Sequence, residues 1–525
     1  MLVVIPTAGI GSRLKSLSDK VNKALVDING KPSISHVVEK FPEDKTFVIA
    51  LGYKGDDVKD FLEMAYPERN FEFVYVEPFE GSGSGLGQTM LQCKDKLQMP
   101  FIFSSNDTIV EDEIPAPDHN WAGYSDKFDT LEYRSLRLKD DLVVDICPKG
   151  AEGNVHPYIG LCGINNFNEF WQSMESSQAS HLVGESFGLQ DLIPLSVKSY
   201  QFNWFDTGNI SSITNARKNL PLALSEVNVL PKEEESIWFC NDKVIKFHVD
   251  KNFIQNRVKR AKLLAPFTPE IISSGKHIYA YKMIEGEVLS RKPTVKNFQL
   301  FLDWMEGFWI SPDLNADELN SFNDSCKKFY KDKTYERVKS FLEIYEVHDP
   351  GGKINDVYID DVFSLLDSLD WESLSSGYPC RFHGDLHFEN ILINQENSKN
   401  TEKFTLLDWR QDFGDSLTTG DIYYDLAKLN HGFIISHEII ANEQFDFHLD
   451  SHGNISFDFD RKNNLFYCQQ ELKTWVNGKG FDWNKVDILT SLIFLNVACL
   501  HHYPYSNLLY YLGKFNLHTA ITKND

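Results

Sequence analysis

Three acidic or amide side chains lie in a fixed order in the second half of the chain. Asp385 follows His383 by two residues and precedes Asn390 by five, in the segment HGDLHFENILIN. Asp408 comes eighteen residues after Asn390, at the end of the apolar segment FTLLD. An aspartate can accept the proton of a hydroxyl group, and an amide oxygen with a second carboxylate can hold Mg²⁺. The spacing indicates a phosphoryl-transfer site, with Asp385 as catalytic base and Asn390 and Asp408 as metal ligands.

A second group of residues, near the start of the chain, suits a nucleotide. The segment PTAGIGSRL places two glycines after an apolar segment and an arginine two residues later, and a lysine follows after ten more. Glycines let backbone N–H groups approach a triphosphate, and the cations add positive charge. The pattern predicts a phosphate-binding loop made by Gly9, Gly11, Arg13 and Lys23.

Three further segments before residue 220 fit the same site. The glycine-rich segment GSGSGLGQTM contains Gly85 and Gly87 and suits packing against a flat base. Asp107 ends the apolar segment of FIFSSND, and Asp206 lies beside Gly208 in NWFDTGNI. A lone aspartate more often caps a turn, but both of these positions suit a magnesium ligand. We therefore expect Asp107 and Asp206 to hold Mg²⁺ next to the nucleotide.

The first 220 residues alternate apolar segments with helix-like ones. MLVVIPT, TFVIALGY, FEFVYVEP and PFIFSSND read as buried strands, and KPSISHVVEKF and GDDVKDFLEMAY have helical spacing. Such an order predicts a mostly parallel α/β sheet with ligands beyond the carboxyl ends of its strands. The segment LPLALSEVNVLPKEEES at 220–236 contains two prolines and an acidic run, and we expect the domain junction there, between residues 228 and 229.

The remaining residues, 229–525, predict a small sheet followed by a helical region. SIWFCNDKVIKFHV reads as a hairpin that turns at Asn241 and Asp242, and KNFIQNRVKRAKLL reads as a helix. A second strand pair follows in IISSGKHIYAYKMI. We expect a small lobe at about 235–290 and a helical lobe at about 293–525, with strands only around 390–408.

Composition limits the partners. The formal charge of −24 argues against nucleic acid or an anionic membrane surface as a primary partner. Eight cysteines without a C-x-x-C pair suggest reduced thiols, and MLVVIP is too short for a signal peptide, so we expect a cytoplasmic protein. The longest apolar segment, ILTSLIFLNVACL at 488–500, is short of a membrane span and predicts a buried helix. We therefore expect small-molecule substrates as partners. The composition does not decide whether the chain forms a homo-oligomer.

Residues 1–220 resemble the sugar-phosphate nucleotidyltransferase family, which begins A-G-x-G-x-R, continues with P-K and later has W-x-D-x-G. The resemblance implies a Rossmann-like α/β domain in which Arg13 and Lys23 bind the triphosphate of CTP or UTP. It also implies that Gly85 and Gly87 line the base and that two aspartates ligate Mg²⁺. The family lysine that grips the acceptor phosphate would be Lys149 of CPKG, and an asparagine replaces the usual proline before Lys23.

Residues 235–525 resemble the aminoglycoside phosphotransferase and choline kinase family, which shows H-G-D-x-x-x-x-N, then I-D-W, then D-x-x-x-D-L-A. The resemblance implies a bilobal, protein-kinase-like α+β domain that uses ATP and Mg²⁺. Lys246 would bind ATP, the hinge at 281–289 including Met283 would bind adenine, and Asp425 would be a structural residue at a helix start. Two features depart from this pattern: no glycine-rich loop precedes Lys246, and helix 252–264 contains no glutamate.

The two resemblances together imply a bifunctional enzyme. The second domain would phosphorylate a sugar or an amino alcohol, and the first would add UMP or CMP to that phosphate for surface polysaccharide or lipid decoration. One alternative is a choline kinase joined to a CTP:phosphocholine-type cytidylyltransferase, for which Trp409 and Tyr423 are candidates to face the cation. Another is an active nucleotidyltransferase with a degenerate kinase-like module for regulation or binding.

Overall fold

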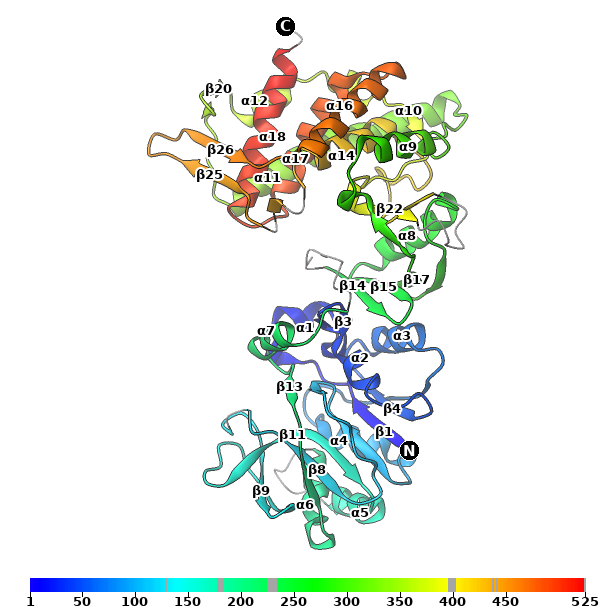
Figure 1. Cartoon of the computed structure of the whole chain (residues 1–525), viewed down its shortest axis with the longest axis vertical. Coiled ribbons are helices and arrows are strands. Elements are labelled where there is room, and N and C mark those ends of the chain that lie inside the picture. The colour runs from blue at the N-terminus through cyan, green and yellow to red at the C-terminus, as the bar shows by residue number, and fades with distance from the viewer. Residues whose placement is uncertain are drawn as a thin grey trace. The chain divides into compact units, whose positions relative to one another are not determined.

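The computed structural model describes residues 1–127, 130–176, 184–223, 234–394, 403–436, 439–440 and 442–523 (Figure 1). It contains two compact units. Unit 1 comprises Met1–Ile254 and Ile271–Met283, and unit 2 comprises Gln255–Glu270 and Ile284–Asp525. The domain boundary expected between 228 and 229 lies outside the described residues and stays a prediction.

A nine-stranded sheet forms the centre of unit 1, in the order β5-β4-β1-β6-β11-β8-β12-β10-β9. Its strands are β1 (Leu2–Pro6), β4 (Thr46–Leu51), β5 (Asn70–Tyr75), β6 (Phe101–Ser104), β8 (Trp121–Tyr124), β9 (Ser135–Lys139), β10 (Leu142–Cys147), β11 (Val155–Ile164) and β12 (Lys198–Gln201). The four predicted strands are confirmed as β1, β4, β5 and β6, which pair in parallel. The expectation of a mostly parallel sheet is wrong beyond them, because the rest is mixed: β11 pairs antiparallel with β6, β8 and β9, whereas β12 pairs in parallel with β8.

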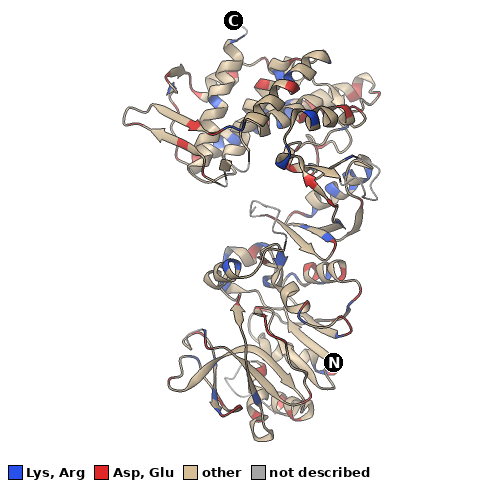
Figure 2. Cartoon of the chain, in the orientation of Figure 1, with Lys and Arg blue, Asp and Glu red and all other residues tan. Residues whose placement is uncertain are grey.

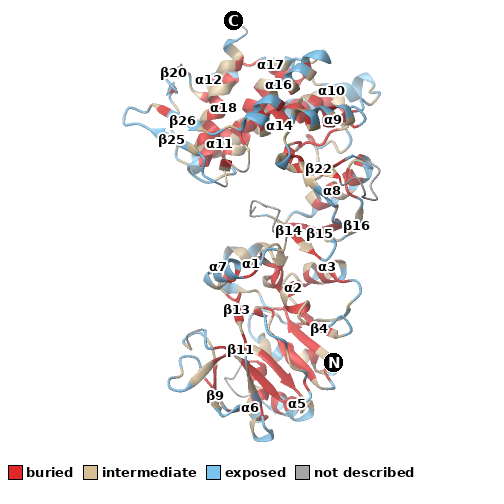
Figure 3. Cartoon of the chain, viewed as in Figure 1, coloured by how far each residue is buried: buried red, intermediate tan, exposed pale blue. Residues whose placement is uncertain are grey.

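The parallel strands β1, β4 and β6 are buried on both faces, whereas the edge strand β5 is partly exposed. Val3 and Ile5 of β1 contribute to one core, and Val4 contributes to a second core on the other face, because successive side chains of a strand alternate. The red of β1 and β4 in Figure 3 reflects this double burial. Each fully buried aliphatic side chain stabilises the fold by about 1.5–3 kcal/mol. The predicted helices are confirmed as α2 (Ser33–Val38) and α3 (Gly55–Ala65).

A four-stranded antiparallel sheet, in the order β14-β15-β17-β16, also belongs to unit 1. Its strands are β14 (Glu235–Cys240), β15 (Lys243–His248), β16 (Ile271–Ser274) and β17 (Ile278–Lys282). The predicted hairpin is confirmed, with Asn241 at φ 53° in its turn. Trp238 is fully buried, and its ring centroid lies 5.2 Å from that of Phe61 on α3. This sheet therefore shares a core with the N-terminal helices.

Unit 2 is mainly helical. Its longer helices are α9 (Val295–Met305), α10 (Ala316–Lys327), α11 (Lys333–Ile344), α14 (Ile422–Ile434), α16 (Asn463–Gly478), α17 (Trp483–Ala498) and α18 (Tyr505–Thr522), and α8 (Lys251–Leu264) begins in unit 1. The apolar segment at 488–500 lies largely on buried helix α17, as predicted. Within the described residues, no helix is both long and apolar enough to cross a bilayer.

Three small sheets complete unit 2. The predicted strands around 390–408 are β22 (Ile391–Asn394) and β23 (Phe404–Leu406), which pair next to β18 (Gly286–Val288). β21 (Pro379–Cys380) pairs with β24 (Gly420–Asp421). The expectation that no other strands occur beyond 293 is wrong, because β19 (Gly352–Ile354), β20 (Val357–Ile359), β25 (Phe445–Leu449) and β26 (Ile455–Phe459) form a further sheet. FDFHL and ISFDF alternate apolar and polar residues, which is the sequence signal for β25 and β26.

Candidate active sites

The first candidate site in unit 1 begins where β1 ends. The hydroxyl of Thr7 donates to the carbonyl of Ala50 at 2.8 Å and ties the end of β1 to β4. Gly11 has φ 73°, and a Cβ there would lie 3.1 Å from Cβ of Lys23, so the loop packs against the lysine. A Cβ on Gly9 would meet no atom within 4 Å, so the backbone is open to a ligand there.

Asn22 positions the lysine, a role that the sequence analysis did not find. Its buried amide donates to the carbonyls of Thr7 at 3.0 Å and Tyr53 at 2.5 Å. Its side-chain oxygen accepts from the N–H of Ala24 at 2.8 Å and begins the short helix Lys23–Leu25. An asparagine is a good helix cap, and this preference was the available signal.

Four predicted residues meet at Gly208. A Cβ on this glycine would lie 3.1 Å from Oδ1 of Asp206, 3.4 Å from Nη2 of Arg13 and 3.4 Å from Oδ2 of Asp107. Nζ of Lys23 lies 3.4 Å from the same oxygen of Asp107. β13 (Trp204–Asp206) pairs antiparallel with β7 (Thr108–Val110), and this pairing brings the two aspartates together. Residues almost 200 positions apart thus form one charged site.

The two aspartates differ in acidity. Burial favours the neutral form of Asp107, but the charges of Lys23 and Arg13 and a hydrogen bond from Ser105 outweigh it, so the pKa of Asp107 lies below its ordinary value. Burial, and then the negative charge of Asp107, raise the pKa of Asp206. A divalent cation between the two carboxylates would relieve this repulsion.

The donor atoms at this site fit Mg²⁺. Carboxylate oxygens are hard ligands, and Mg²⁺ is commonly bound by one or two carboxylates with substrate phosphates and water completing its shell. Among the described residues, no group of three or more His, Cys, Asp or Glu could hold a metal by itself. Asp206 is further held by the hydroxyl of Tyr133, which donates to its Oδ2 at 3.0 Å and was not predicted. Phosphates would therefore have to supply the remaining ligands.

The glycine-rich segment forms a turn before α4 (Leu86–Cys93). Gly81, Gly83 and Gly85 have φ of 74°, 88° and 142°, which side chains rarely adopt. Gly87 packs instead near Gly184, since a Cβ on it would lie 3.5 Å from the Gly184 nitrogen. An open hollow of about 490 Å³, lined by Glu77, Pro78, Phe79 and Glu80, directly precedes this segment. It is the hollow next to the predicted base-binding residues.

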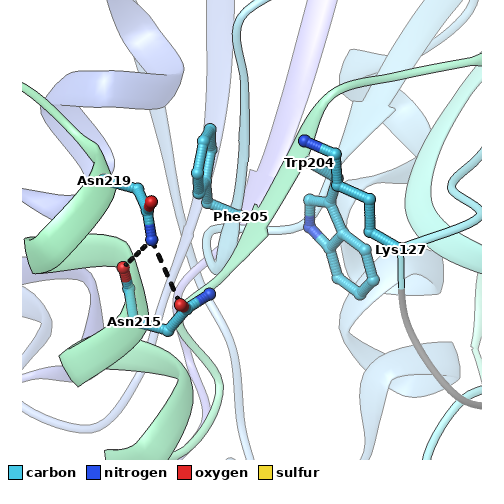
Figure 4. Close-up of a pocket in the computed structure, with 5 residues that line it drawn as sticks. All are labelled: Lys127, Trp204, Phe205, Asn215 and Asn219. Carbon is cyan, nitrogen blue, oxygen red and sulfur yellow. Dashed lines mark hydrogen bonds between the residues drawn. The ribbon is translucent and has the colours of Figure 1, made fainter.

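A second hollow of about 370 Å³ lies beside β13, which carries Asp206 (Figure 4). Its lining residues are Lys127, Trp204, Phe205, Asn215 and Asn219. Lys127 places Nζ 5.8 Å from the centroid of the Phe205 ring. Lys149, predicted to hold the acceptor phosphate, lies in an exposed turn after β10. In the described part of the chain, no hydrogen bond or ion pair joins Lys149 to the aspartates.

In unit 2, His383 fixes the loop that carries Asp385. Its buried ring contacts the carbonyl of Leu407 through Nε2 at 2.8 Å and the N–H of Asp385 through Nδ1 at 3.2 Å. These partners assign the proton to Nε2. Burial lowers the pKa of His383 to about 4, so the ring is neutral at physiological pH. His383 is therefore a positioning residue.

Asp425 holds the same loop through hydrogen bonds to its backbone. Its two carboxylate oxygens accept the N–H groups of His383 at 2.8 Å and Gly384 at 2.7 Å, and Trp309 donates to it at 3.0 Å. Burial raises the pKa of Asp425 to about 6. Asp425 lies in the first turn of α14, as expected, although the cap of this helix is Asp421, whose oxygen accepts the N–H of Tyr423 at 3.1 Å. Asp425 is structural through the loop rather than through its own helix.

Asp385 and Asn390 lie together, as predicted. Nδ2 of Asn390 donates to the carbonyl of Asp385 at 2.9 Å and contacts Nε2 of His387 at 3.1 Å. These bonds use the amide nitrogen, so the amide oxygen is the atom able to face a metal. Lys428 of α14, which the sequence analysis did not consider, places Nζ 2.7 Å from Oδ1 of Asp385.

Asp408 is paired with an arginine of α8. Nη1 of Arg257 lies 2.8 Å from Oδ1 of Asp408, and the Trp409 indole donates to the Arg257 carbonyl at 2.9 Å. Asp408 has φ 57°, a conformation that costs a non-glycine residue about 1–2 kcal/mol. Such strain is common at functional sites. The helix that departs from the kinase-like pattern by lacking a glutamate thus presents a cation to the predicted metal ligand.

Two predicted ATP contacts belong to unit 1. Lys246 is buried on β15, opposite Tyr279 of β17. The N–H of Met283 donates to the carbonyl of Asp242 at 2.7 Å, so adenine would have to use another hinge group as donor. Their roles in ATP binding stay predictions.

Sequence comparison finds local similarity only. No family model matches the chain. It is 31% identical over 116 residues to the bifunctional protein GlmU of Methanocaldococcus jannaschii, covering 22% of this chain and 26% of that protein. It is 26% identical over 111 residues to the UTP–glucose-1-phosphate uridylyltransferase AglF of Haloferax volcanii, covering 21% and 44%. The match to GlmU thus spans about a quarter of that relative's length.

Comparison with solved structures also finds similarity to part of the chain. UDP-glucose pyrophosphorylase complexed with UDP-glucose has a TM-score of 0.35 at 16% identity, covering 41% of this chain and 97% of that one. The CTP:phosphocholine cytidylyltransferase from Streptococcus pneumoniae has a TM-score of 0.34 at 18% identity, covering 41% and 98%.

Proposed function

We propose that unit 1 transfers a nucleotidyl group from CTP or UTP to a phosphate monoester and releases pyrophosphate. The observation that carries the proposal is the meeting of Arg13, Lys23, Asp107 and Asp206 at Gly208, beside an open glycine loop. The local similarity to AglF supports it, because that protein's name describes uridylyl transfer to glucose 1-phosphate.

In this reaction an oxygen of the acceptor phosphate attacks the α-phosphorus of the nucleotide. A new P–O bond forms there while the bond to the bridging oxygen breaks, and pyrophosphate leaves with the electron pair. Arg13 and Lys23 would neutralise the charge of the triphosphate and hold it in line. Asp107 and Asp206 would hold Mg²⁺, which supplies further positive charge. Lys149 is the proposed anchor of the acceptor phosphate.

We further propose that unit 2 transfers the γ-phosphate of ATP to a hydroxyl group. Asp385 would accept the hydroxyl proton, and Asn390 and Asp408 would hold Mg²⁺. The support is the fixed loop geometry, in which Asp425 accepts the N–H groups of His383 and Gly384 and the His383 ring accepts that of Asp385. Lys246 and Met283 would contact ATP.

The two reactions fit in sequence. A small-molecule kinase makes a phosphate monoester, and a nucleotidyltransferase consumes one. Joining them in one chain raises the effective concentration of the intermediate. The product would be an activated precursor for surface polysaccharide or lipid decoration.

A second candidate for unit 2 is a binding module without phosphoryl transfer. The ion pair between Arg257 and Asp408 favours this candidate, because it occupies a predicted metal ligand. A screen of the full chain with each NTP and candidate phosphates, read as pyrophosphate release, tests unit 1. ATP-dependent phosphorylation that disappears in Asp385→Ala tests unit 2, and ATP binding without turnover would select the binding module.

A further inference from the structure

Basic side chains gather next to Asp385 in unit 2. Nζ of Lys428 lies 2.7 Å from Oδ1 of Asp385. Nζ of Lys333 and Cζ of Arg410 lie 4.2 Å and 4.9 Å from the centroid of the Phe329 ring, so both cations pack on one ring. Another arginine follows Lys333 by one turn on α11. We define the cationic cluster as Lys333, Arg337, Arg410 and Lys428.

The members of the cluster act on one another. Burial, followed by the charges of Arg410, Arg337 and Lys428, holds the pKa of Lys333 well below its usual range. Arg410 likewise disfavours the charged form of Lys428, although Asp385 keeps that lysine protonated. Like charges held this close in a partly buried site favour either the loss of a proton or the binding of an anion that balances them.

Elements of the fold fix these side chains. The N–H of Arg410 donates to the carbonyl of His383 at 2.9 Å. A Cβ on Gly384 would lie 2.7 Å from Cβ of Arg410, so the arginine packs directly on the loop of the proposed base. On α11, Thr334 accepts a hydrogen bond from Asn496 of α17 at 3.1 Å. The cluster is thus a built feature and not a set of mobile surface lysines.

Few carboxylates face the cluster. Asp385 pairs with Lys428, and Asp412 favours the charged forms of Lys333 and Arg410, against four basic side chains. In the described part of the chain, no ion pair reaches Lys333, Arg337 or Arg410, and the buried Nε of Arg410 has no hydrogen-bond partner. Acidic and basic residues are interspersed along both units (Figure 2), and the whole chain carries −24. Composition therefore does not explain this local excess of positive charge.

The aromatic candidates for a cationic substrate have other roles. Trp409 is buried, and its indole is used by the Arg257 carbonyl. The hydroxyl of Tyr423 accepts the N–H of Asp482 at 3.0 Å, and Nζ of Lys485 lies 4.6 Å from its ring centroid. Neither ring serves a choline-like group in this arrangement.

We propose that the hydroxyl compound phosphorylated at Asp385 carries its own anionic group, a carboxylate or a phosphate, which the cationic cluster binds. This inference rests on the proposed kinase function of unit 2. Arginine binds either group with paired hydrogen bonds, while an amino alcohol would meet like charge. The γ-phosphate moves from ATP to the substrate hydroxyl oxygen, the hydroxyl proton passes to Asp385, and ADP leaves. The anionic group is unchanged, so the acceptor of unit 1 would carry two acidic groups.

Small hydroxyl compounds that differ in charge test the inference on the full-length chain. We expect glycerate or glycerol 3-phosphate to be phosphorylated with a higher kcat/KM than glycerol, ethanolamine or choline. In Arg410→Gln and, separately, Lys333→Met, the KM of the preferred acid should rise about 10- to 100-fold, as for the loss of a charged hydrogen bond. The KM of ATP should stay within about twofold, and the exposed Lys339→Met on the same helix should change neither value.

Three outcomes would overturn the inference. One is preference for an uncharged or cationic alcohol. Another is an equal rise in the KM of ATP, which would assign the cluster to the triphosphate. If no compound is phosphorylated, the kinase proposal fails separately, and calorimetry with glycerate and glycerol 3-phosphate decides the cluster. Binding that Arg410→Gln weakens supports the inference, and absence of binding to the wild-type chain is the third outcome against it.

Discussion

Nη1 of Arg257 donates to Oδ1 of Asp408 at 2.8 Å, so a helix that lacks an acidic residue supplies a cation to the proposed metal ligand of unit 2. The arginine side chain is almost fully buried, and the aspartate side chain is 21% exposed, which limits solvent screening of the pair. Any Mg²⁺ that binds Asp408 has to compete with this charge.

Removing Arg257 should therefore strengthen metal binding. In Arg257→Met we expect the Mg²⁺ concentration that half-saturates ATP phosphorylation to fall about 3- to 10-fold, because one competing positive charge is gone. Titration of Mg²⁺ at saturating ATP measures this. Lys259→Met, an exposed lysine on the same helix, is the control. A higher Mg²⁺ requirement would instead show that Arg257 holds Asp408 in place for the metal.

The carboxylate of Asp206 in unit 1 should support activity and lower the stability of the fold. Because burial and Asp107 raise the pKa of Asp206, its ionised form is disfavoured in the folded chain. Asp206→Asn should raise the midpoint of thermal unfolding at neutral pH and reduce pyrophosphate release by about 100-fold or more. Asp107→Asn should lower activity without the gain in stability, since its pKa is depressed. Equal thermal shifts in the two variants would contradict this assignment.

Asp425 should make the stability of unit 2 depend on pH. Its pKa rises from an ordinary 3.8 to about 6 in the folded chain, so the folded state binds more protons than the unfolded state between these values. The stabilisation by protonation is complete below pH 4 and is lost as the pH rises through 6, an effect of up to about 3 kcal/mol. Denaturant unfolding of the wild type and Asp425→Asn from pH 4 to 7 measures it. Parallel curves for the two proteins would show that Asp425 does not titrate there.

Asn22 should act through Lys23 and the glycine loop. Asn22→Ala removes three hydrogen bonds, and we expect a rise in the KM of the nucleotide and a loss of about 1–3 kcal/mol in the free energy of unfolding. Asn22→Pro should lose less, because Asn22 already has φ −59°, which proline imposes. Nucleotide titrations and unfolding curves measure both. A smaller effect in Asn22→Ala than in Asn22→Pro would show that backbone conformation is not the deciding factor.

The sequence predicts the parts of these sites that depend on residue type and strand position. Arg13 and Asp107 follow β1 and β6, and the carboxyl ends of neighbouring parallel strands meet at one edge of a sheet. Asp206 instead ends β13, which reaches the site through its antiparallel pairing with β7. Local spacing also places Asn390 next to Asp385.

Long-range partners could not be predicted in the same way. Arg257 and Asp408 are 151 positions apart, and only the packing of α8 brings them together. The antiparallel half of the large sheet was missed because β-strand patterns show burial but not the direction of pairing.

The shared core around Trp238 joins β14 to the amino-terminal part of the chain. Cleavage of the chain at the expected junction, between residues 228 and 229, would separate β14 from Phe61. The amino-terminal fragment would then expose the apolar surface that the Trp238 indole covers, and such exposed apolar surfaces promote aggregation. Side-chain packing, as well as the peptide backbone, therefore holds β14 to the amino-terminal part of the chain.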